Sequence, residues 1–251
     1  MSGHSKWHSI KHKKGAADAK RGKLFSKINR AILCAARNGG GDPDKNIELR
    51  NALLKAKEGN MPKDTIERAI KKGTGDVDGV VYKTVVYEAY APCGVALVID
   101  TLTDNNNRIT SDIRHILDKS DGSLGTSGCV AYMFKRKGMI YIPAAGNDED
   151  KLMEIVLDAG ADDLVAADDK FEVKCAPEAF DAVRKALETA GIAIESSELT
   201  MLADTEIPVT TVVDARKILR IIDELEELDD VQAVHANFDI PESVLKELGD
   251  N

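Results

Sequence analysis

Apolar side chains recur three and four residues apart in three segments near the start of the chain, and glycine follows each segment. This spacing predicts amphipathic helices over residues 23–38, from about Asp42-Pro43 to residue 58, and from Pro62 to residue 72. Glycine ends helices readily because it adopts the left-handed conformation cheaply, and proline is tolerated in a first helical turn. The segments therefore predict a bundle of three short helices.

After residue 77 the pattern changes to that of mixed strands and helices. Residues 80–90 and 94–102 are rich in β-branched and aromatic side chains and predict a hairpin, followed by a helix and a strand that ends at Phe134. Residues 138–203 give the order βαββαβ, which is the split βαβ arrangement of ferredoxin-like domains. The segment after Pro208 adds one helix and one strand.

These elements predict an α+β, multidomain protein with an N-terminal basic arm and a three-helix module, followed by two ferredoxin-like α+β domains. We expect the second of these domains to be inserted in the first, because the last helix cannot bury its apolar face alone. The predicted boundaries are 1–22 for the arm, 23–77 for the helical module, 78–137 plus 204–251 for the discontinuous α+β domain, and 138–203 for the inserted domain.

Charge is unevenly distributed along the 251 residues. Residues 1–77 hold 18 Lys and Arg against 8 Asp and Glu, a net charge of +10, whereas the remaining residues have a net charge of −19. A basic module carried by acidic domains is typical of proteins that bind a polyanion, most often nucleic acid. No apolar run is long enough to span a bilayer, and no export signal follows the basic start, so we expect a cytoplasmic protein with no membrane partner.

The densest basic stretch covers the arm and the start of the first helix, where nine cations surround one tryptophan against a single acid. Such a stretch can bind phosphates and stack one base. The predicted nucleic-acid-binding residues are Lys6, Trp7, Lys11, His12, Lys13, Lys14, Lys20, Arg21, Lys23, Lys27 and Arg30. A merely solvated basic tail is the alternative, but this excess of cations is larger than solubility requires.

Three histidines of the arm, His4, His8 and His12, lie four residues apart and raise the question of a metal site. No cysteine or carboxylate lies among them, and the neighbouring lysines would repel a cation, so we expect no metal and no cofactor. The four cysteines match no close-spaced zinc motif and give no reason to propose disulfides. No catalytic triad or nucleotide-binding glycine loop is recognisable, so we predict no enzymatic activity and no small-molecule substrate.

Two polar segments are interpreted as structural. Residues Thr103 to Arg108 follow a strand and open a helix, so their side chains and free backbone amides can either cap the helix or bind an anion. We favour capping, with Arg108 the residue most worth testing as a surface contact. The acidic residues from Asp223 to Asp230 are interpreted as a solvated helix face because no basic partner is near them in sequence.

Several ordered blocks resemble the YebC family of transcriptional regulators and cover essentially the whole chain. They include Gly3-His4-Ser5-Lys6-Trp7, Lys11-His12-Lys13-Lys14, Gly39-Gly40-Gly41-Asp42-Pro43, Asn60-Met61-Pro62, Thr103-Asp104-Asn105 and Val130-Ala131-Tyr132. The resemblance implies a helical module plus two α+β domains and a cytoplasmic, DNA-binding transcriptional regulator. The chain departs from the family pattern at Cys93, where glycine is common.

The resemblance also implies a second target. The mitochondrial relative is a translational activator of cytochrome c oxidase subunit I, and bacterial members are linked to ribosomes and to translation through proline-rich stretches. Our first hypothesis is therefore a DNA-binding transcriptional regulator. The alternative is a translation factor that associates with the ribosome and its RNA, relieving stalling at proline-rich stretches.

Overall fold

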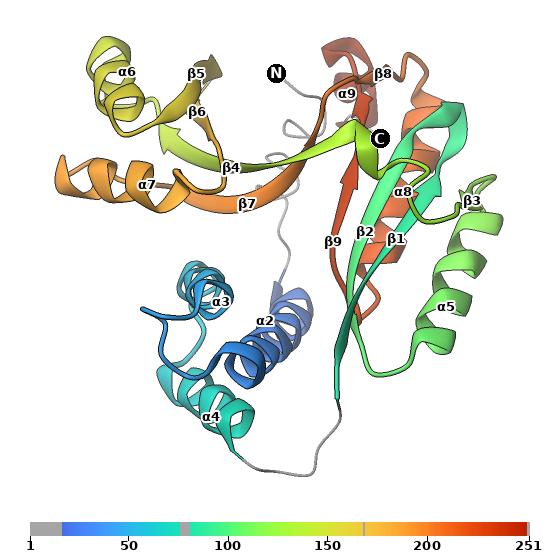
Figure 1. Cartoon of the computed structure of the whole chain (residues 1–251). Coiled ribbons are helices and arrows are strands. Elements are labelled where there is room, and N and C mark those ends of the chain that lie inside the picture. Colours follow the sequence, from blue (N-terminus) through green and yellow to red (C-terminus); the bar gives the residue numbers. More distant parts are fainter. Residues whose placement is uncertain (1–16, 76–80, 168, 250–251) are drawn as a thin grey trace. The chain divides into compact units, whose positions relative to one another are not determined.

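The computed structural model describes residues 17–75, 81–167 and 169–249 (Figure 1). It consists of helices, two four-stranded antiparallel sheets and one short parallel pair of strands, which confirms the predicted α+β class. The described residues form two compact units. One runs from Phe134 to Asp204 and is called the inserted unit here, and the other, the main unit, contains the described residues up to Met133 and from Thr205.

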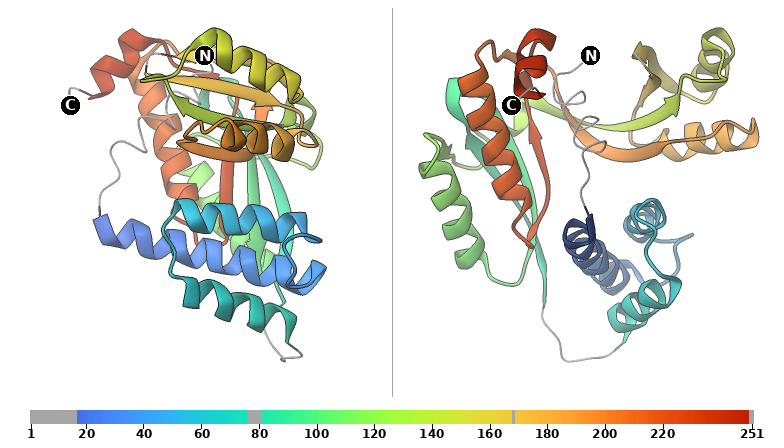
Figure 2. Two further views of the ribbon diagram at one scale, coloured as in Figure 1. Left: turned by 90° about the vertical axis from the view of Figure 1, so that its left-hand side faces the viewer. Right: turned by 180° about the vertical axis from the view of Figure 1, so that it is seen from behind.

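The first part of the main unit is a three-helix bundle of α2 (Ala17–Gly39), α3 (Ile47–Glu58) and α4 (Lys63–Thr74). Figure 2 shows α3 and α4 lying along α2. Its core consists of small and branched apolar residues, namely Ile28, Ile32, Ala35, Ala36, Leu49, Ala52, Ala56, Met61 and Ala69. The helix α2 begins earlier than the apolar spacing predicts, because its first turns are rich in alanine and basic residues that favour a helix without needing a buried face.

The predicted start of the second helix was wrong. Helix α3 begins at Ile47, because the Asn46 side chain caps it by accepting a hydrogen bond from the Leu49 amide at 3.1 Å. The same side chain donates to the carbonyl oxygens of Ala35 and Gly40, each at 2.8 Å. Asn46 therefore fixes the end of α2 and the start of α3 together.

Helix α4 continues one residue past Gly73, which the sequence pattern treats as its end. Gly73 is buried, and a Cβ atom there would lie 2.5 Å from the carbonyl oxygen of Leu33 and 2.8 Å from Cβ of Ala36. Both contacts are shorter than van der Waals separation, so glycine is required for α4 to approach α2 this closely.

The rest of the main unit is a sheet covered by two long helices. Its elements are β1 (Lys83–Tyr90), η1 (Pro92–Gly94), β2 (Ala96–Thr103), α5 (Asn106–Asp118), β3 (Ser123–Leu124), η2 (Ala131–Met133), β8 (Ile207–Pro208), α8 (Val212–Glu226), β9 (Val231–Ala236), β10 (Phe238–Asp239) and α9 (Glu242–Gly249). The sheet order is β3-β1-β2-β9, and all three pairings are antiparallel. Leu97 pairs with Ala236, so the chain after the inserted unit returns to complete this sheet.

The connection between β1 and β2 contains a non-glycine residue with left-handed backbone. Cys93 has φ +64° and Gly94 has φ +76°. A glycine, which is common at position 93 in the family the sequence resembles, would adopt this conformation without strain. The hairpin keeps its turn with cysteine at that position.

The inserted unit has the predicted split βαβ topology. Its elements are β4 (Phe134–Pro143), α6 (Glu149–Asp158), β5 (Ala161–Ala167), β6 (Lys170–Cys175), α7 (Phe180–Thr189) and β7 (Ser196–Ala203). The strand order is β5-β6-β4-β7, and α6 and α7 pack on the buried residues of one face. The sheet of the main unit instead has the β1-β2 hairpin in its centre, so it shares the two-layer composition but not this strand order.

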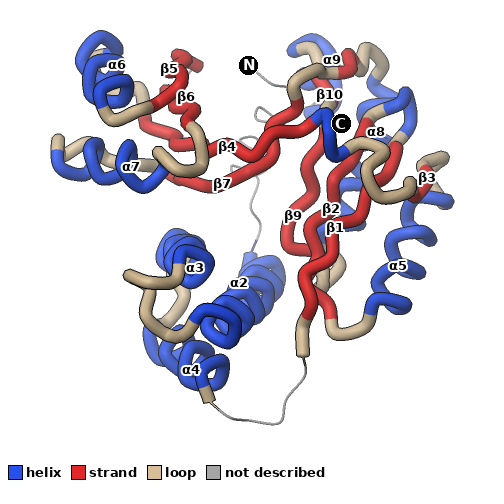
Figure 3. The backbone as a smooth tube through the Cα atoms, in the orientation of Figure 1, coloured by secondary structure: helices blue, strands red, loops and turns tan. Residues whose placement is uncertain are grey.

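One strand was predicted as two. The sequence pattern ends a strand at Phe134 and begins another at Met139, whereas Figure 3 shows β4 as one continuous strand. Gly138 does not interrupt it. A Cβ atom at Gly138 would lie 2.6 Å from both Cys175 Sγ and Phe180 Cδ2, so this glycine makes room for α7 within an unbroken strand.

Candidate nucleic-acid interface

The predicted nucleic-acid-binding residues fall into three groups in the structure. Lys6, Trp7, Lys11, His12, Lys13 and Lys14 lie outside the described residues. Lys20 and Arg21 lie in the first turns of α2, where the backbone is described. The side chains of Lys23, Lys27 and Arg30 are described, and all three contact the turn between α8 and β9.

This turn, residues 226–230, is called the acidic turn here. Lys23 Nζ forms an ion pair with Glu227, and Lys27 Nζ donates to the backbone carbonyl of Glu226 at 2.6 Å. Glu226 and Glu227 are the last residue and the C-cap of α8. Cations are favourable there because the C-terminal carbonyls of a helix carry partial negative charge.

Arg30 is the most deeply engaged of the three cations. Its Nη1 atom donates to Asp230 Oδ1 at 2.6 Å, to the Asp229 carbonyl at 2.9 Å and to the Leu102 carbonyl at 3.2 Å. The guanidinium also lies 4.9 Å from the centre of the Tyr82 ring. Only 17% of the Arg30 side chain is exposed, so this contact joins α2 to the sheet of the main unit.

Asp230 is the centre of a buried network. Its Oδ2 atom accepts hydrogen bonds from Thr103 Oγ1 at 2.7 Å and from Arg108 Nη2 at 2.6 Å, while Oδ1 accepts the bond from Arg30. Burial raises the pKa of this carboxyl, but the bonds from Thr103, Arg108 and Arg30 outweigh it, so the pKa lies below its ordinary value. The interpretation of residues 223–230 as a solvated face is therefore wrong for Asp230, whose side chain is 7% exposed.

The segment at the start of α5 has the capping role predicted for it. The Asn105 side chain accepts hydrogen bonds from the amides of Asn107 and Arg108, both at 3.1 Å. Arg108 also pairs with Asp104 at 2.7 Å, and its hydrogen bonds to Asp230 and Asp104 raise its pKa. Arg108 thus holds the acidic turn against α5.

Other exposed cations of the three-helix bundle lie on α3 and α4, and α4 carries four of them. Lys63, Arg68, Lys71 and Lys72 are all exposed, and Arg68 Nε donates to the Asp64 carbonyl at 3.0 Å. These four side chains face outward, as the helical spacing of their buried neighbours predicts. The predicted nucleic-acid-binding residues do not include these four cations, although the apolar spacing of α4 places them on its outer face.

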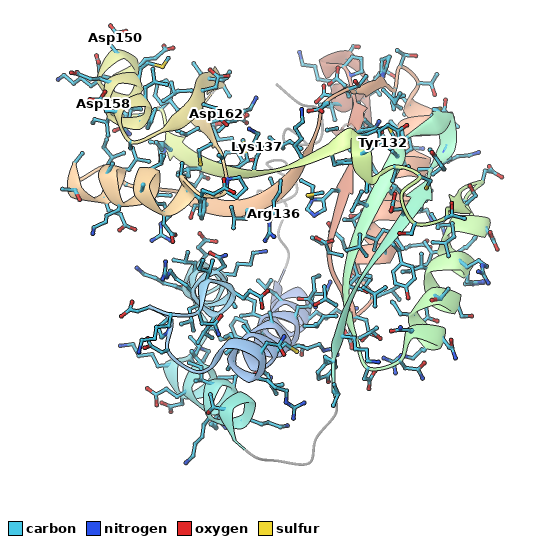
Figure 4. All side chains as sticks on the ribbon, viewed as in Figure 1. Tyr132, Arg136, Lys137, Asp150, Asp158 and Asp162 are labelled. Atoms are coloured by element: carbon cyan, nitrogen blue, oxygen red, sulfur yellow. The ribbon has the colours of Figure 1, made fainter. Side chains whose placement is uncertain are left out.

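In the inserted unit, cations at the start of β4 form ion pairs. Lys137 Nζ lies 2.8 Å from Asp162 Oδ2, and Figure 4 shows the two side chains close together on β4 and β5. Lys135 Nζ lies 2.8 Å from Asp204 Oδ2. The hydrogen bond to Asp162 raises the pKa of Lys137 and keeps it positively charged.

Two models of one protein family together match almost the full length of this chain. The model described as the TACO1/YebC protein N-terminal domain matches residues 5–76, and the model described as the TACO1/YebC second and third domain matches residues 82–238. The chain belongs to the TACO1/YebC family. This confirms the family that the sequence blocks resemble.

Relatives within the TACO1/YebC family are similar over their full lengths. A probable transcriptional regulatory protein from Syntrophobacter fumaroxidans is 55% identical, with 98% of each chain covered. One of the same description from Desulfotalea psychrophila is 50% identical, with 100% of each covered. The crystal structure of a conserved hypothetical protein from Aquifex aeolicus has a TM-score of 0.81 at 45% identity, covering 90% of this chain and 93% of that one. The names of the two curated relatives describe regulators rather than enzymes.

Burial affects two of the cysteines in this TACO1/YebC chain. Burial raises the pKa of Cys34, and it raises that of Cys175 to about 11, so these thiols stay protonated at neutral pH and are poor nucleophiles. Across the described ranges, no group of three or more His, Cys, Asp and Glu is arranged to hold a metal ion. Among the same residues, no helix is both long and apolar enough to cross a bilayer.

A buried carboxylate organises the loop between β3 and β4. Glu88 on β1 accepts hydrogen bonds from the amides of Gly128 at 2.5 Å, Val130 at 2.6 Å and Ala131 at 2.7 Å. Burial raises its pKa, but the three amide bonds outweigh burial and leave the pKa below its ordinary value. The ionised carboxylate therefore holds the loop.

We expect Glu88→Gln to lower the free energy of unfolding by about 2 kcal/mol, because the neutral amide is a weaker acceptor and turns an NH2 group toward backbone donors. Urea unfolding at pH 7 measures this loss. The wild type should also lose stability as the pH falls below about 4.3, the usual Glu pKa, since only the unfolded chain takes up the proton there. The variant should lack this part of the pH dependence.

Glu154→Gln provides a matched control, since it removes the same charge from an exposed position on α6. We expect a change below about 0.5 kcal/mol for this control. Equal stability of the Glu88 and Glu154 variants would contradict the role assigned to Glu88.

Proposed function

We propose that this member of the TACO1/YebC family is a cytoplasmic nucleic-acid-binding regulator whose target is DNA, and that it regulates transcription. The observation that carries the proposal is the separation of charge, +10 over residues 1–77 and −19 over the remainder. Such a chain attracts a polyanion to one part and repels it from the other, which restricts where nucleic acid binds. The relatives named probable transcriptional regulatory proteins support the same activity.

The arm and the outer side of α4 are the proposed contacts. In the arm these are Lys6, Trp7, Lys11, His12, Lys13 and Lys14, joined by Lys20 and Arg21 at the start of α2. Lys23, Lys27 and Arg30 contribute less, because the acidic turn already engages them. If about six cations release counterions from duplex DNA, log K should fall against log salt with a slope of about −5.

The alternative is a translation factor that binds ribosomal RNA, and the composition of α4 is compatible with it. The exposed cations of α4 are lysine and arginine, and the helix contains neither asparagine nor glutamine, which read adenine edges in the major groove. Contacts to phosphates carry no sequence information of their own. A surface of this composition suits a folded RNA as well as a duplex.

Sedimentation through a sucrose gradient distinguishes the two targets. The full chain and a variant lacking residues 1–16, which keeps α2 complete, are run from DNase-treated lysate at low and moderate salt. For a DNA-binding regulator, we expect the full chain to remain at the top of the gradient while the purified protein binds duplex DNA. The shortened variant should lose DNA binding.

Sedimentation of the full chain with ribosomes, lost in the shortened variant, would instead assign the RNA target. A full chain that binds neither duplex DNA nor ribosomes would contradict both functions. If the shortened variant binds as tightly as the full chain, the role of the arm is wrong.

A further inference from the structure

Tyr132 is the most exposed of the large hydrophobic side chains in the described part of the protein, at 74%. It lies in η2, the turn that precedes β4, and Figure 4 shows it there. The apolar side chains two residues away on either side point inward, since Val130 is 0% exposed and Phe134 is 6% exposed. The turn therefore directs one aromatic ring into solvent between two buried neighbours.

The backbone beneath this ring is held in place by several hydrogen bonds. The Glu88 carboxylate binds the amides of Gly128, Val130 and Ala131, as described above, and the Gly125 amide donates to the Glu88 carbonyl at 2.8 Å. Next to the ring, the Met133 amide donates to the Val130 carbonyl at 2.9 Å. The loop is thus ordered before any ligand binds, which removes part of the entropy cost of binding.

A single exposed aromatic ring is common on protein surfaces and needs no explanation by itself. Here a buried, ionised carboxylate is used to order the loop, and burying a charge is costly unless it is fully hydrogen-bonded. The ring that this loop presents has no comparable packing of its own, since most of its surface faces water. Rigid presentation of an exposed, amphipathic ring is the arrangement that recognition surfaces use.

We propose that Tyr132 is a stacking platform for an unpaired nucleobase. This proposal rests on the nucleic-acid binding proposed above and adds that the target exposes unpaired bases. Exposed aromatic rings are typical of surfaces that bind single strands, because every base has a face that can stack on a ring. The arm supplies charge, whereas Tyr132 supplies a contact that charge alone cannot make.

The test compares Tyr132→Ala and Tyr132→Phe with the wild type by fluorescence anisotropy at fixed salt. The probes are a labelled single-stranded oligonucleotide and an abasic oligonucleotide with the same number of phosphates. We expect Tyr132→Ala to weaken binding to the first probe by about 5- to 100-fold and Tyr132→Phe to change it by less than about twofold. All three proteins should bind the abasic probe equally, with unchanged melting temperatures.

Val213→Ala is the matched control, because Val213 is 67% exposed on α8 of the same unit and is expected to leave both affinities unchanged. Equal affinity of wild type and Tyr132→Ala for the oligonucleotide would overturn the inference. So would a loss in Tyr132→Phe as large as in Tyr132→Ala, since that result indicates a hydroxyl hydrogen bond rather than stacking. If arm variants weaken binding and Tyr132→Ala does not, only this inference fails, whereas a wild type that binds neither these probes nor duplex DNA overturns the proposed function as well.

Discussion

Replacing Lys11, Lys13 and Lys14 together by glutamate is expected to weaken nucleic-acid binding by at least about 100-fold at 0.1 M salt. Each replacement removes a cation that releases counterions and adds an anion that phosphates repel. On duplex DNA, the slope of log K against log salt should become shallower by about 3. Anisotropy titrations at several salt concentrations measure both quantities.

The control is the triple variant Lys151→Glu, Lys185→Glu and Lys246→Glu, which changes the net charge equally at exposed positions on α6, α7 and α9. We expect its affinity to fall by less than about fivefold, because only the field of the whole protein changes. Similar losses in both variants would show that net charge, not the arm, controls binding. Both variants should melt as the wild type does, since lysine is seldom buried.

The second large effect is expected at Asp230. Asp230→Asn keeps the shape of the side chain but removes the charge that Arg30, Thr103 and Arg108 share, so we expect a loss of about 3 kcal/mol in the free energy of unfolding. Most of this loss comes from leaving the Arg30 guanidinium, 17% exposed, without its carboxylate. Urea unfolding with a probe in the main unit measures it.

The pH dependence of this contact has a definite sign. The pKa of Asp230 is lowered in the folded protein, so between that pKa and the usual Asp value of about 3.9 the unfolded chain binds more protons. Stability from this group is therefore complete above about pH 4 and is lost as the pH falls further. The free energy of unfolding of Asp230→Asn should therefore fall less steeply below about pH 4 than that of the wild type.

Asp229→Asn is the matched control for Asp230, because its side chain is exposed and only its backbone carbonyl contacts Arg30. We expect a change below about 0.5 kcal/mol for this neighbour. The double variant Arg30→Gln, Asp230→Asn should be less destabilised than the sum of the single variants. Strictly additive effects would contradict direct coupling of the two side chains.

The sequence predicts the helices of the bundle well because each depends on apolar spacing within a few residues. The features of the fold that the sequence does not predict depend on contacts between residues far apart in the chain. Asn46 caps α3 while binding two carbonyls at the end of α2, and Gly138 looks like a break until Phe180 of α7 is seen against it. Neither reason is visible in the local pattern.

The candidate interface was harder still to predict from the sequence, because its contacts join residues that are distant in the chain. A count of charges identifies Lys23, Lys27 and Arg30 as cations of a basic stretch, but cannot show that they meet the acidic turn about 200 residues later. The exposed cations of α4 were visible in the helical spacing. The arm residues remain predicted contacts, which the variants above test.

The pairing of β2 with β9 has a consequence for synthesis of the protein. These strands flank the inserted unit in sequence, with β2 ending at Thr103 and β9 beginning at Val231. At the usual elongation rates, the ribosome needs on the order of 10 s to make the intervening residues. During that time the nascent β2, rich in valine, leucine and isoleucine, has an open edge, and the inserted unit can fold first because its strands pair only with one another.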